Sequence, residues 1–461
     1  MIEYLELLDS IVWGPVTLVL LLGTGIYLMV RMQFLPLRNL GYALRCAIGR
    51  DDTDRQKRAS HGAVSPFSAL MTELAATIGT GNIVGVATAM VLGGPGALFW
   101  MIVSALTGMA TKLAESLLSV RYRTVNGEGK IAGGPMYVME RGMKNRRLGK
   151  GMGSAFALFA VGASLGMGNM TQSNSIAQAL SESFQIPVEK TGLCMTILTI
   201  LAILGGIGTI SRITGVLVPC MAVFYIFGTL FVIGRNLGNL PQGIGQILQM
   251  AFTREAVVGG TGGSIVVTMQ QAVRWGVSRG VFTNEAGLGA AGISAAAADT
   301  DDPVRQGYIS MTGVFLDTIV ICTLTGLAIV SSGVLGRTDE NGIPLTGAAL
   351  TIEAFSTAFG EAGAKFISIG IVLFAFATIL GWEYQGEKAF EFLVRSGRWC
   401  MLYRFVYALF VFVGAVCALN VVWSFSDIMN ALMVIPNLTA VWLLSGEACR
   451  AVREHRRDRS L

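Results

Sequence analysis

The chain has 461 residues, of which 53% are hydrophobic and only 14% are charged, with a net charge of +5. A soluble domain carries about 25% charged residues, so this composition excludes an ordinary soluble protein and indicates one that crosses a membrane repeatedly. The seven cysteines show no CxxC spacing and the two histidines, His61 and His455, lie in charged segments. We therefore expect no metal centre or catalytic site built from histidine or cysteine, and no enzyme activity.

Eleven apolar segments are long enough for membrane spans, since a spanning helix needs about 20 residues. The stretch before the first of them has three acidic residues and no basic one, so this segment is expected to be an uncleaved span rather than a signal peptide. The segments are residues 11–31, 66–92, 94–119, 152–180, 190–207, 211–234, 261–298, 307–334, 364–390, 401–420 and 424–447. The segment 261–298 is too long and too rich in glycine for one straight helix, and we expect two half-helices there.

The distribution of lysine and arginine orients these spans. With the N-terminus outside, most of the 34 basic residues fall in inner segments, which include residues 31–65, 112–150 and 450–459. Because loops on the cytoplasmic side carry an excess of Lys and Arg, the N-terminus is predicted outside and the C-terminus inside the cytoplasmic (inner) membrane.

Two of the predicted spans contain polar, glycine-rich interruptions. One is Gly79-Thr80-Gly81-Asn82 and the other runs from Asn284 to Gly289. Without the first span, ten remain and divide into two sets of five with opposite orientation, each set beginning with an interrupted span. This pattern predicts an all-α transporter with a 5+5 inverted repeat and an extra N-terminal helix. The extra helix and the loop that follows it occupy residues 1–65, the first five-helix repeat occupies residues 66–240, and the second occupies residues 241–461. An alternative role for the glycines of the first interruption is to let neighbouring helices pack closely, without a break for ligand binding.

The first interruption suits two kinds of ligand. Free amides at the start of a half-helix favour a carboxylate, while free carbonyls with Thr or Asn oxygens favour a hard cation such as sodium. In the second, Asn284 and Thr283 are candidate ion or amine ligands, and Glu285 is expected to pair with Arg279 or Arg274. The run Gly287 to Gly292 matches a dinucleotide fingerprint by letter only, because no strand precedes it.

Ionisable and amide side chains inside spans give further candidates. Glu73 lies one helical turn before Thr77 and is either near a substrate amine or in a solvated vestibule. Asp317 either supports an ion site or has a structural role, whereas Lys112 and Glu115 are expected at the membrane interface. Thr378 and Trp382 share one helix face as candidate pocket residues. Gln172 lies on a polar side of the span at 152–180.

Several long motifs in order resemble the alanine/glycine:cation symporter family. They are the stretches from Ala75 to Ala89, Gly93 to Ala97, Gly108 to Lys112, Ala132 to Tyr137 and Phe282 to Gly289, followed by Gly381-Trp382. The resemblance covers most of the chain, from about residue 66 to 390. It implies a leucine-transporter-type fold and sodium-coupled transport of small neutral amino acids.

The resemblance also implies residue roles. Thr77, Gly79, Thr80 and Gly81 would bind the substrate carboxylate, Phe282 and Trp382 would wall the pocket, and Thr378 and Gln172 would be polar contacts. For sodium, the implied ligands are Thr77 and Asn82 at one site and Ala75, Ile78 and Thr378 at another.

The predicted function is sodium-coupled import of alanine and glycine, with serine as a further candidate, by alternating access. The expected partners are the amino acid, sodium and the lipid bilayer, and no nucleic acid. The alternatives are a proton-coupled carrier with Glu73 or Asp317 as the proton site, and a channel or sensor on the same scaffold. The lack of a charged ring or filter argues against a channel.

Overall fold

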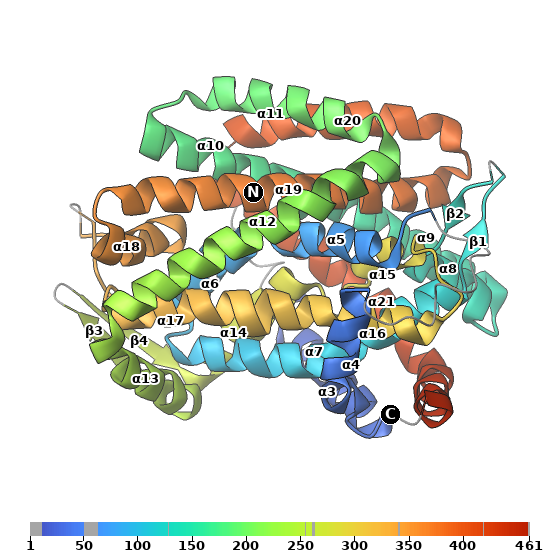
Figure 1. Cartoon of the computed structure of the whole chain (residues 1–461), viewed down its shortest axis with the longest axis horizontal. Helices are drawn as coiled ribbons and strands as arrows, with labels where there is room; N and C mark the ends of the chain where they lie inside the picture. The colour runs from blue at the N-terminus through green and yellow to red at the C-terminus, as the bar shows by residue number, and fades with distance from the viewer. Residues whose placement is uncertain are drawn as a thin grey trace.

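The computed structural model describes residues 12–49, 63–127, 129–253, 255–260, 263–339, 342–417 and 419–459. Most long helices run along the longest axis of the molecule (Figure 1). Within the described residues, seven continuous helical segments are long and apolar enough to cross a membrane, and two of them run through a π-helical turn. This nearly all-helical architecture confirms the predicted class.

The first half of the structure starts with α2 and reaches a long oblique helix, α12. Its helices are α2 (Pro15–Arg31), α3 (Leu35–Arg38), α4 (Leu40–Ala47), α5 (Pro66–Thr77), α6 (Val84–Leu92), α7 (Gly96–Arg121), α8 (Pro135–Gly142), α9 (Arg146–Leu165), α10 (Thr171–Phe184), α11 (Val188–Ile203) and α12 (Gly206–Arg235). A 3-10 turn, η2 (Thr80–Asn82), lies between α5 and α6, and a π-helical segment, η3 (Gly166–Met170), joins α9 to α10. A short hairpin pairs β1 (Thr124–Val125) with β2 (Ile131–Ala132).

The second half has the same kind of interruptions. It contains η4 (Leu237–Asn239), α13 (Leu240–Phe252), α14 (Met269–Asn284), α15 (Ala290–Ala296), α16 (Pro303–Val314), the π-helical η5 (Phe315–Cys322), α17 (Thr323–Ser332), α18 (Gly347–Phe359), α19 (Ala362–Val394), η6 (Gly397–Trp399), α20 (Cys400–Val416) and α21 (Leu419–Arg459). An antiparallel hairpin of β3 (Glu255–Gly260) and β4 (Gly263–Thr268) precedes α14.

The prediction for residues 261–298 was wrong at its beginning. The helix starts only at Met269, where the Thr268 side chain accepts a hydrogen bond from the Gln271 backbone N–H and forms a capping box. The preceding residues, Ser264 to Val267, belong to a strand, as β-branched residues favour. The remainder of the segment forms two helices separated by a break, as expected.

Local signals explain where the helices that carry the site begin. Ser65 caps α5 by accepting from the Ser68 backbone N–H, and Pro66 follows at the first helical position. Asp302 caps α16 in the same way, with Pro303 next to it. The helix α5 then packs against α12, α19, α15 and α16, so its interrupted end lies deep in the molecule.

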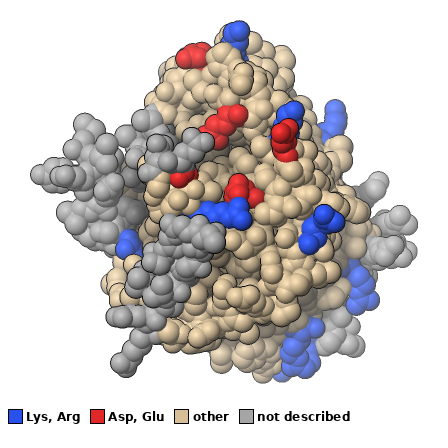
Figure 2. All heavy atoms as spheres, turned by 90° about the vertical axis from the view of Figure 1, so that its left-hand side faces the viewer, with Lys and Arg blue, Asp and Glu red and all other residues tan. Residues whose placement is uncertain are grey.

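One end of the molecule carries α18 and the β3–β4 hairpin. Figure 2 looks onto this end and shows acidic and basic side chains interspersed on a mostly uncharged surface. The opposite end carries α8 and the β1–β2 hairpin (Figure 1). The segment before α5 that was expected to be basic, residues 50–62, lies outside the described residues, as do residues 1–11.

Candidate functional site

The first helix interruption is fully buried and lies where the sequence predicted it. The helix α5 ends at Thr77, and Ile78 and Gly79 leave helical geometry before η2 begins at Thr80. The backbone N–H of Gly79 donates to the Asn82 Oδ1 atom at 2.9 Å, and that of Thr80 donates to Gln172 Oε1 at 3.2 Å. Side-chain oxygens therefore occupy the two amides that a carboxylate would otherwise contact.

Two glycines of this interruption touch the residues that the resemblance implied as pocket residues. A Cβ atom at Gly79 would lie 2.5 Å from Thr378 Oγ1 and 3.3 Å from Gln172 Oε1. At Gly81 it would lie 3.3 Å from the Phe282 ring. The structure thus brings α5, α10, α14 and α19 together around the break, with space only for glycine at these two positions.

The second interruption needs positive φ angles. The helix α14 ends at Asn284, and Glu285, Gly287 and Gly289 have φ angles of 56°, 99° and 83°. Glycine adopts such angles without steric strain, whereas Glu285 does so at a cost. This end of α14 is buried beside the first interruption, because Thr283 lies next to Gly81.

A cluster of oxygen atoms joins the two interruptions. Asn82 Nδ2 donates to Asp317 Oδ1 at 2.8 Å, and Thr318 Oγ1 donates to Asp317 Oδ2 at 2.7 Å. Thr283 Oγ1 lies 3.4 Å from Thr318 Oγ1. All four side chains are buried. Such oxygens are the ligands that hard cations prefer, and Asp317 contributes a carboxyl group that adds a negative charge when it is ionised.

The ion set implied by the resemblance is compatible with this geometry. Thr378 Oγ1 donates to the Ile78 carbonyl at 3.4 Å, so those two candidates are adjacent. Thr77 Oγ1 donates to the Leu74 carbonyl at 3.3 Å, which leaves the Thr77 carbonyl at the end of the helix. Ala75, three residues before Ile78, is buried in α5.

The Asn284 side chain forms two hydrogen bonds close to its own position in the chain. Its Nδ2 donates to Thr318 Oγ1 at 3.1 Å, and its Oδ1 accepts from the Ala286 backbone N–H at 3.0 Å. These bonds stabilise the second interruption.

Glu73 is buried and does not lie in a solvated vestibule. Lys112 and Glu115 are also buried, so the prediction that they lie at the membrane interface was wrong. The Lys112 Nζ atom lies 3.4 Å from Glu73 Oε1 and donates to the Asn284 carbonyl at 2.9 Å, with both charged side chains fully buried. Glu115 Oε1 accepts from the Gly287 backbone N–H at 3.1 Å. The expectation failed because α14, α15 and α16 pack against α7, where Lys112 and Glu115 are buried. This ion pair binds both interruptions to α7.

Arg279 pairs with a partner that the sequence analysis missed. Its guanidinium donates to both Asp427 carboxylate oxygens, at 3.4 and 2.8 Å. The expected pairing of Arg279 with Glu285 was therefore wrong. Both Glu285 oxygens lack a hydrogen-bond partner among the described residues. The rule that ionisable residues inside spans are functional candidates would have found Asp427.

Above the first interruption lies a pocket of about 450 Å³ between α6, α10 and the start of α18. Arg279 and Trp423 line it, and the Phe282 ring stacks on Trp423 with centroids 5.4 Å apart. Phe282 thus contacts both Trp423, which lines the pocket, and Gly81. Leu92, at the end of α6, and Gly347, at the start of α18, also line the pocket.

Trp382 lies one turn beyond Thr378 on α19 and is fully buried. It packs on η3, where a Cβ at Gly168 would lie 2.3 Å from its Cβ and Cγ atoms. Its indole N–H lacks a hydrogen-bond partner among the described residues. Trp382 and Phe282 belong to the same buried apolar cluster.

Comparison with known proteins gives consistent results. The sequence profile of the "Sodium:alanine symporter family" matches residues 1–460. "Sodium/alanine symporter AgcS" of Methanococcus maripaludis is 49% identical over 448 residues, which cover 96% of this chain and 95% of that protein. "Probable sodium/glutamine symporter GlnT" of Bacillus subtilis is 37% identical, with 98% and 90% covered. Among solved structures, MhsT in complex with L-phenylalanine has a TM-score of 0.56 at 14% identity, covering 83% of this chain and 89% of MhsT. That likeness confirms the leucine-transporter-type fold.

Proposed function

Because the chain belongs to the sodium:alanine symporter family, we propose that it imports small neutral amino acids together with sodium by alternating access. The chain is a multi-pass membrane transporter and not an enzyme. The observation that carries the proposal is the buried interruption from Ile78 to Asn82, surrounded by Gln172 and Thr378. It combines non-helical backbone groups and oxygen-bearing side chains in one place, as the broken helices of transporters do.

The substrate carboxylate would bind at the amides of Gly79 and Thr80. In the present structure Asn82 and Gln172 supply the acceptor oxygens for these amides. A carboxylate offers the same acceptors with a full charge, and such charge-assisted hydrogen bonds are stronger. Binding would therefore displace the Gln172 amide, which becomes free to contact the substrate from the side.

The pocket would accept only a small side chain. Gly79 approaches Thr378, and Gly81 approaches Phe282, so closely that no added methyl group fits between them. Because the walls of the proposed site are packed this closely, alanine and glycine are the proposed substrates, and serine is a further candidate because it adds a single hydroxyl group. The comparison with AgcS supports alanine.

Sodium would bind beneath the substrate at the oxygens of the first interruption. The proposed ligands are the Thr77 carbonyl and the Asn82 side chain at one site, and the Ala75 and Ile78 carbonyls with the Thr378 side chain at another. Asp317 would supply the countercharge through Asn82. An ion that holds the two interruptions in register would stabilise the conformation that receives substrate, which couples the two binding events.

The transporter would lie in the cytoplasmic membrane with its N-terminus outside, in agreement with the distribution of basic residues. The pocket lined by Arg279 and Trp423 would be the outer entrance and Phe282 its inner wall. Trp382 would close the path on the other side of the site. The two five-helix units, 66–240 and 241–461, would then rearrange around the proposed substrate site.

The proposal is tested by removing the two proposed side-chain ligands of the ion. Asn82→Ala and Thr378→Ala are expected to abolish sodium-driven alanine uptake while the purified protein keeps its elution volume and helical content. Thr439→Ala is the matched control, because Thr439 also donates to the carbonyl of the preceding turn but is exposed on α21. Full sodium-driven uptake by both site variants would overturn the assignment.

Proton coupling is the second candidate, because Glu73 and Asp317 are carboxylates buried without solvent contact. Each would need a cation or a proton to remain there. Uptake that follows an imposed pH gradient in the absence of sodium, and that is uncoupled by Glu73→Gln, would select this mechanism instead.

A further inference from the structure

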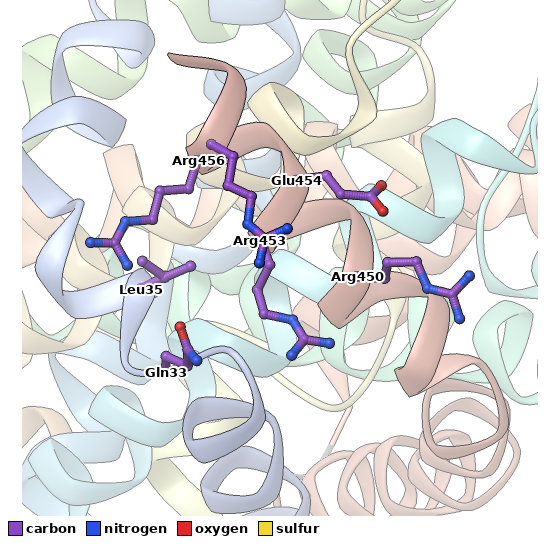
Figure 3. A pocket seen from close by; sticks show the side chains of 7 residues that line it. Gln33, Leu35, Arg450, Arg453, Glu454 and Arg456 are labelled. Carbon is purple, nitrogen blue, oxygen red and sulfur yellow. The ribbon is translucent and has the colours of Figure 1, made fainter. Parts of the chain in front are cut away.

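A pocket of about 490 Å³ lies away from the transport site, at the end of α21. Four arginines line it, namely Arg450, Arg453, Arg456 and Arg457, with Glu454 as the one acidic lining residue. The turn between α2 and α3 closes it with Gln33 and Leu35. Figure 3 shows Arg453 and Arg456 of α21 across the pocket from Gln33 and Leu35.

The arginines are presented by a helix that is fixed on its other face. Ala448, Cys449 and Val452 are buried, and the His455 ring lies 3.2 Å from the Tyr42 hydroxyl, which holds the end of α21 against α4. The exposed arginines 450, 453 and 457 follow helical spacing and so lie on one face. The geometry of the basic face is therefore set by packing and not by the arginines themselves.

This basic face is not neutralised by neighbouring carboxylates. Within the part of the chain that the structure describes, no ion pair joins Arg450, Arg453 or Arg457 to an acidic residue. Arg453 donates only to the Cys449 carbonyl of its own helix. Exposed cations of this kind are available to an anionic ligand.

An exposed apolar seam leads to the same pocket. The helices α2 and α21 are joined by the stacked rings of Tyr27 and Trp442, whose centroids are 4.1 Å apart. Next to this contact, Ile26, Val30 and Leu443 are more than half exposed. In a membrane these side chains face lipid, and Val30 lies only three residues before Gln33 of the pocket.

We propose that this pocket binds the phosphate of an anionic phospholipid headgroup, with the acyl chains of the lipid along the α2–α21 seam. Arginine suits the ligand because its planar guanidinium donates two parallel hydrogen bonds to phosphate oxygens. The basic end of a spanning helix is also where anionic lipid headgroups lie. The lipid would join α2, which precedes the transport repeats, to the C-terminal helix α21.

The test compares binding of an anionic phospholipid with binding of a phospholipid that has no net charge and with binding of free phosphate. Purified protein is titrated with phosphatidylglycerol, phosphatidylcholine or inorganic phosphate, and binding is followed by native mass spectrometry and by the melting temperature. We expect phosphatidylglycerol to bind and raise the melting temperature, with phosphatidylcholine and phosphate ineffective. Stabilisation by inorganic phosphate alone would reassign the pocket to a free anion and overturn the lipid proposal, as would equal binding of the two lipids.

Variants locate the site. The triple variant R450Q/R453Q/R457Q removes three charges, each worth roughly a factor of five near an anionic surface, so phosphatidylglycerol affinity should fall about 100-fold. The matched control is R146Q/R147Q, which removes exposed charges at the start of α9. Undiminished lipid binding by the triple variant would contradict the proposal. If that variant does not fold, the three titrations of the unchanged protein still decide the outcome.

Discussion

The buried ion pair between Lys112 and Glu73 allows a quantitative prediction. Both side chains are fully buried, and the Lys112 Nζ atom contacts Glu73 Oε1 at 3.4 Å and the Asn284 carbonyl at 2.9 Å. Lys112→Met keeps most of the side-chain volume but leaves the Glu73 charge without a partner. Removing one member of a buried pair costs about 3–5 kcal/mol, so we expect a destabilisation of that size.

This free energy converts into a shift of the melting temperature. With an unfolding entropy of about 2 cal/mol/K per residue, a chain of 461 residues has about 1 kcal/mol/K in total, so the melting temperature should fall by about 3–5 °C. The assay is thermal unfolding of the purified transporter followed by tryptophan fluorescence. The double variant E73Q/K112M removes both charges and should recover at least half of the loss.

The matched control is Lys144→Met, since Lys144 is exposed. It should change the melting temperature by less than about 1 °C, because surface charges contribute little to stability. If K112M is as stable as the unchanged protein, or if the double variant loses as much as the two single variants together, the pair is not the link between α5, α7 and the second interruption.

Three further predictions concern the transport site. Gly79→Ala places a methyl group into an occupied site and should lower alanine uptake at least about tenfold, which corresponds to roughly 1.4 kcal/mol. Gly151→Ala, at an exposed position of α9 where nothing lies within 4 Å, should leave uptake unchanged in the same assay. Asp317→Asn removes the countercharge at the proposed ion site, so the sodium concentration for half-maximal uptake should rise by about tenfold or more, and an unchanged value would contradict its role. Asp427→Ala leaves Arg279, which lines the 450 Å³ pocket, without its carboxylate partner and should lower the melting temperature by roughly 3–5 °C, whereas an unchanged melting temperature would show that this ion pair does not stabilise the fold.

The sequence predicted the two interruptions well because their cause is local. Gly287 and Gly289 are needed for positive φ angles, and Asn82 accepts from a freed amide three residues earlier, so both features are visible in the order of residue types. The seven long apolar helices were equally visible, because about 20 apolar residues are enough to indicate a span.

The contacts of charged residues could not be read from the sequence because they depend on how distant helices pack. Glu73 and Lys112 are 39 positions apart, and Arg279 and Asp427 are 148 apart. Periodicity gives the face on which such a residue lies but not its neighbour. For the same reason Lys112, near the end of a predicted span, was assigned to the interface although other helices cover it.

The strand at Gly263–Thr268 was missed for a different reason. Its apolar, β-branched residues have the same hydropathy as a membrane helix, and hydropathy alone does not distinguish the two. The capping residues Thr268 and Gln271 were the signal that the helix starts later.

The most direct test of the proposed function is uptake of labelled alanine into proteoliposomes. An inward sodium gradient is imposed, and potassium replaces sodium in the control. The account predicts accumulation of alanine above its external concentration that disappears when sodium is replaced. Equal uptake in both conditions, or no uptake of alanine or glycine under any gradient, would contradict the proposed sodium-coupled transport.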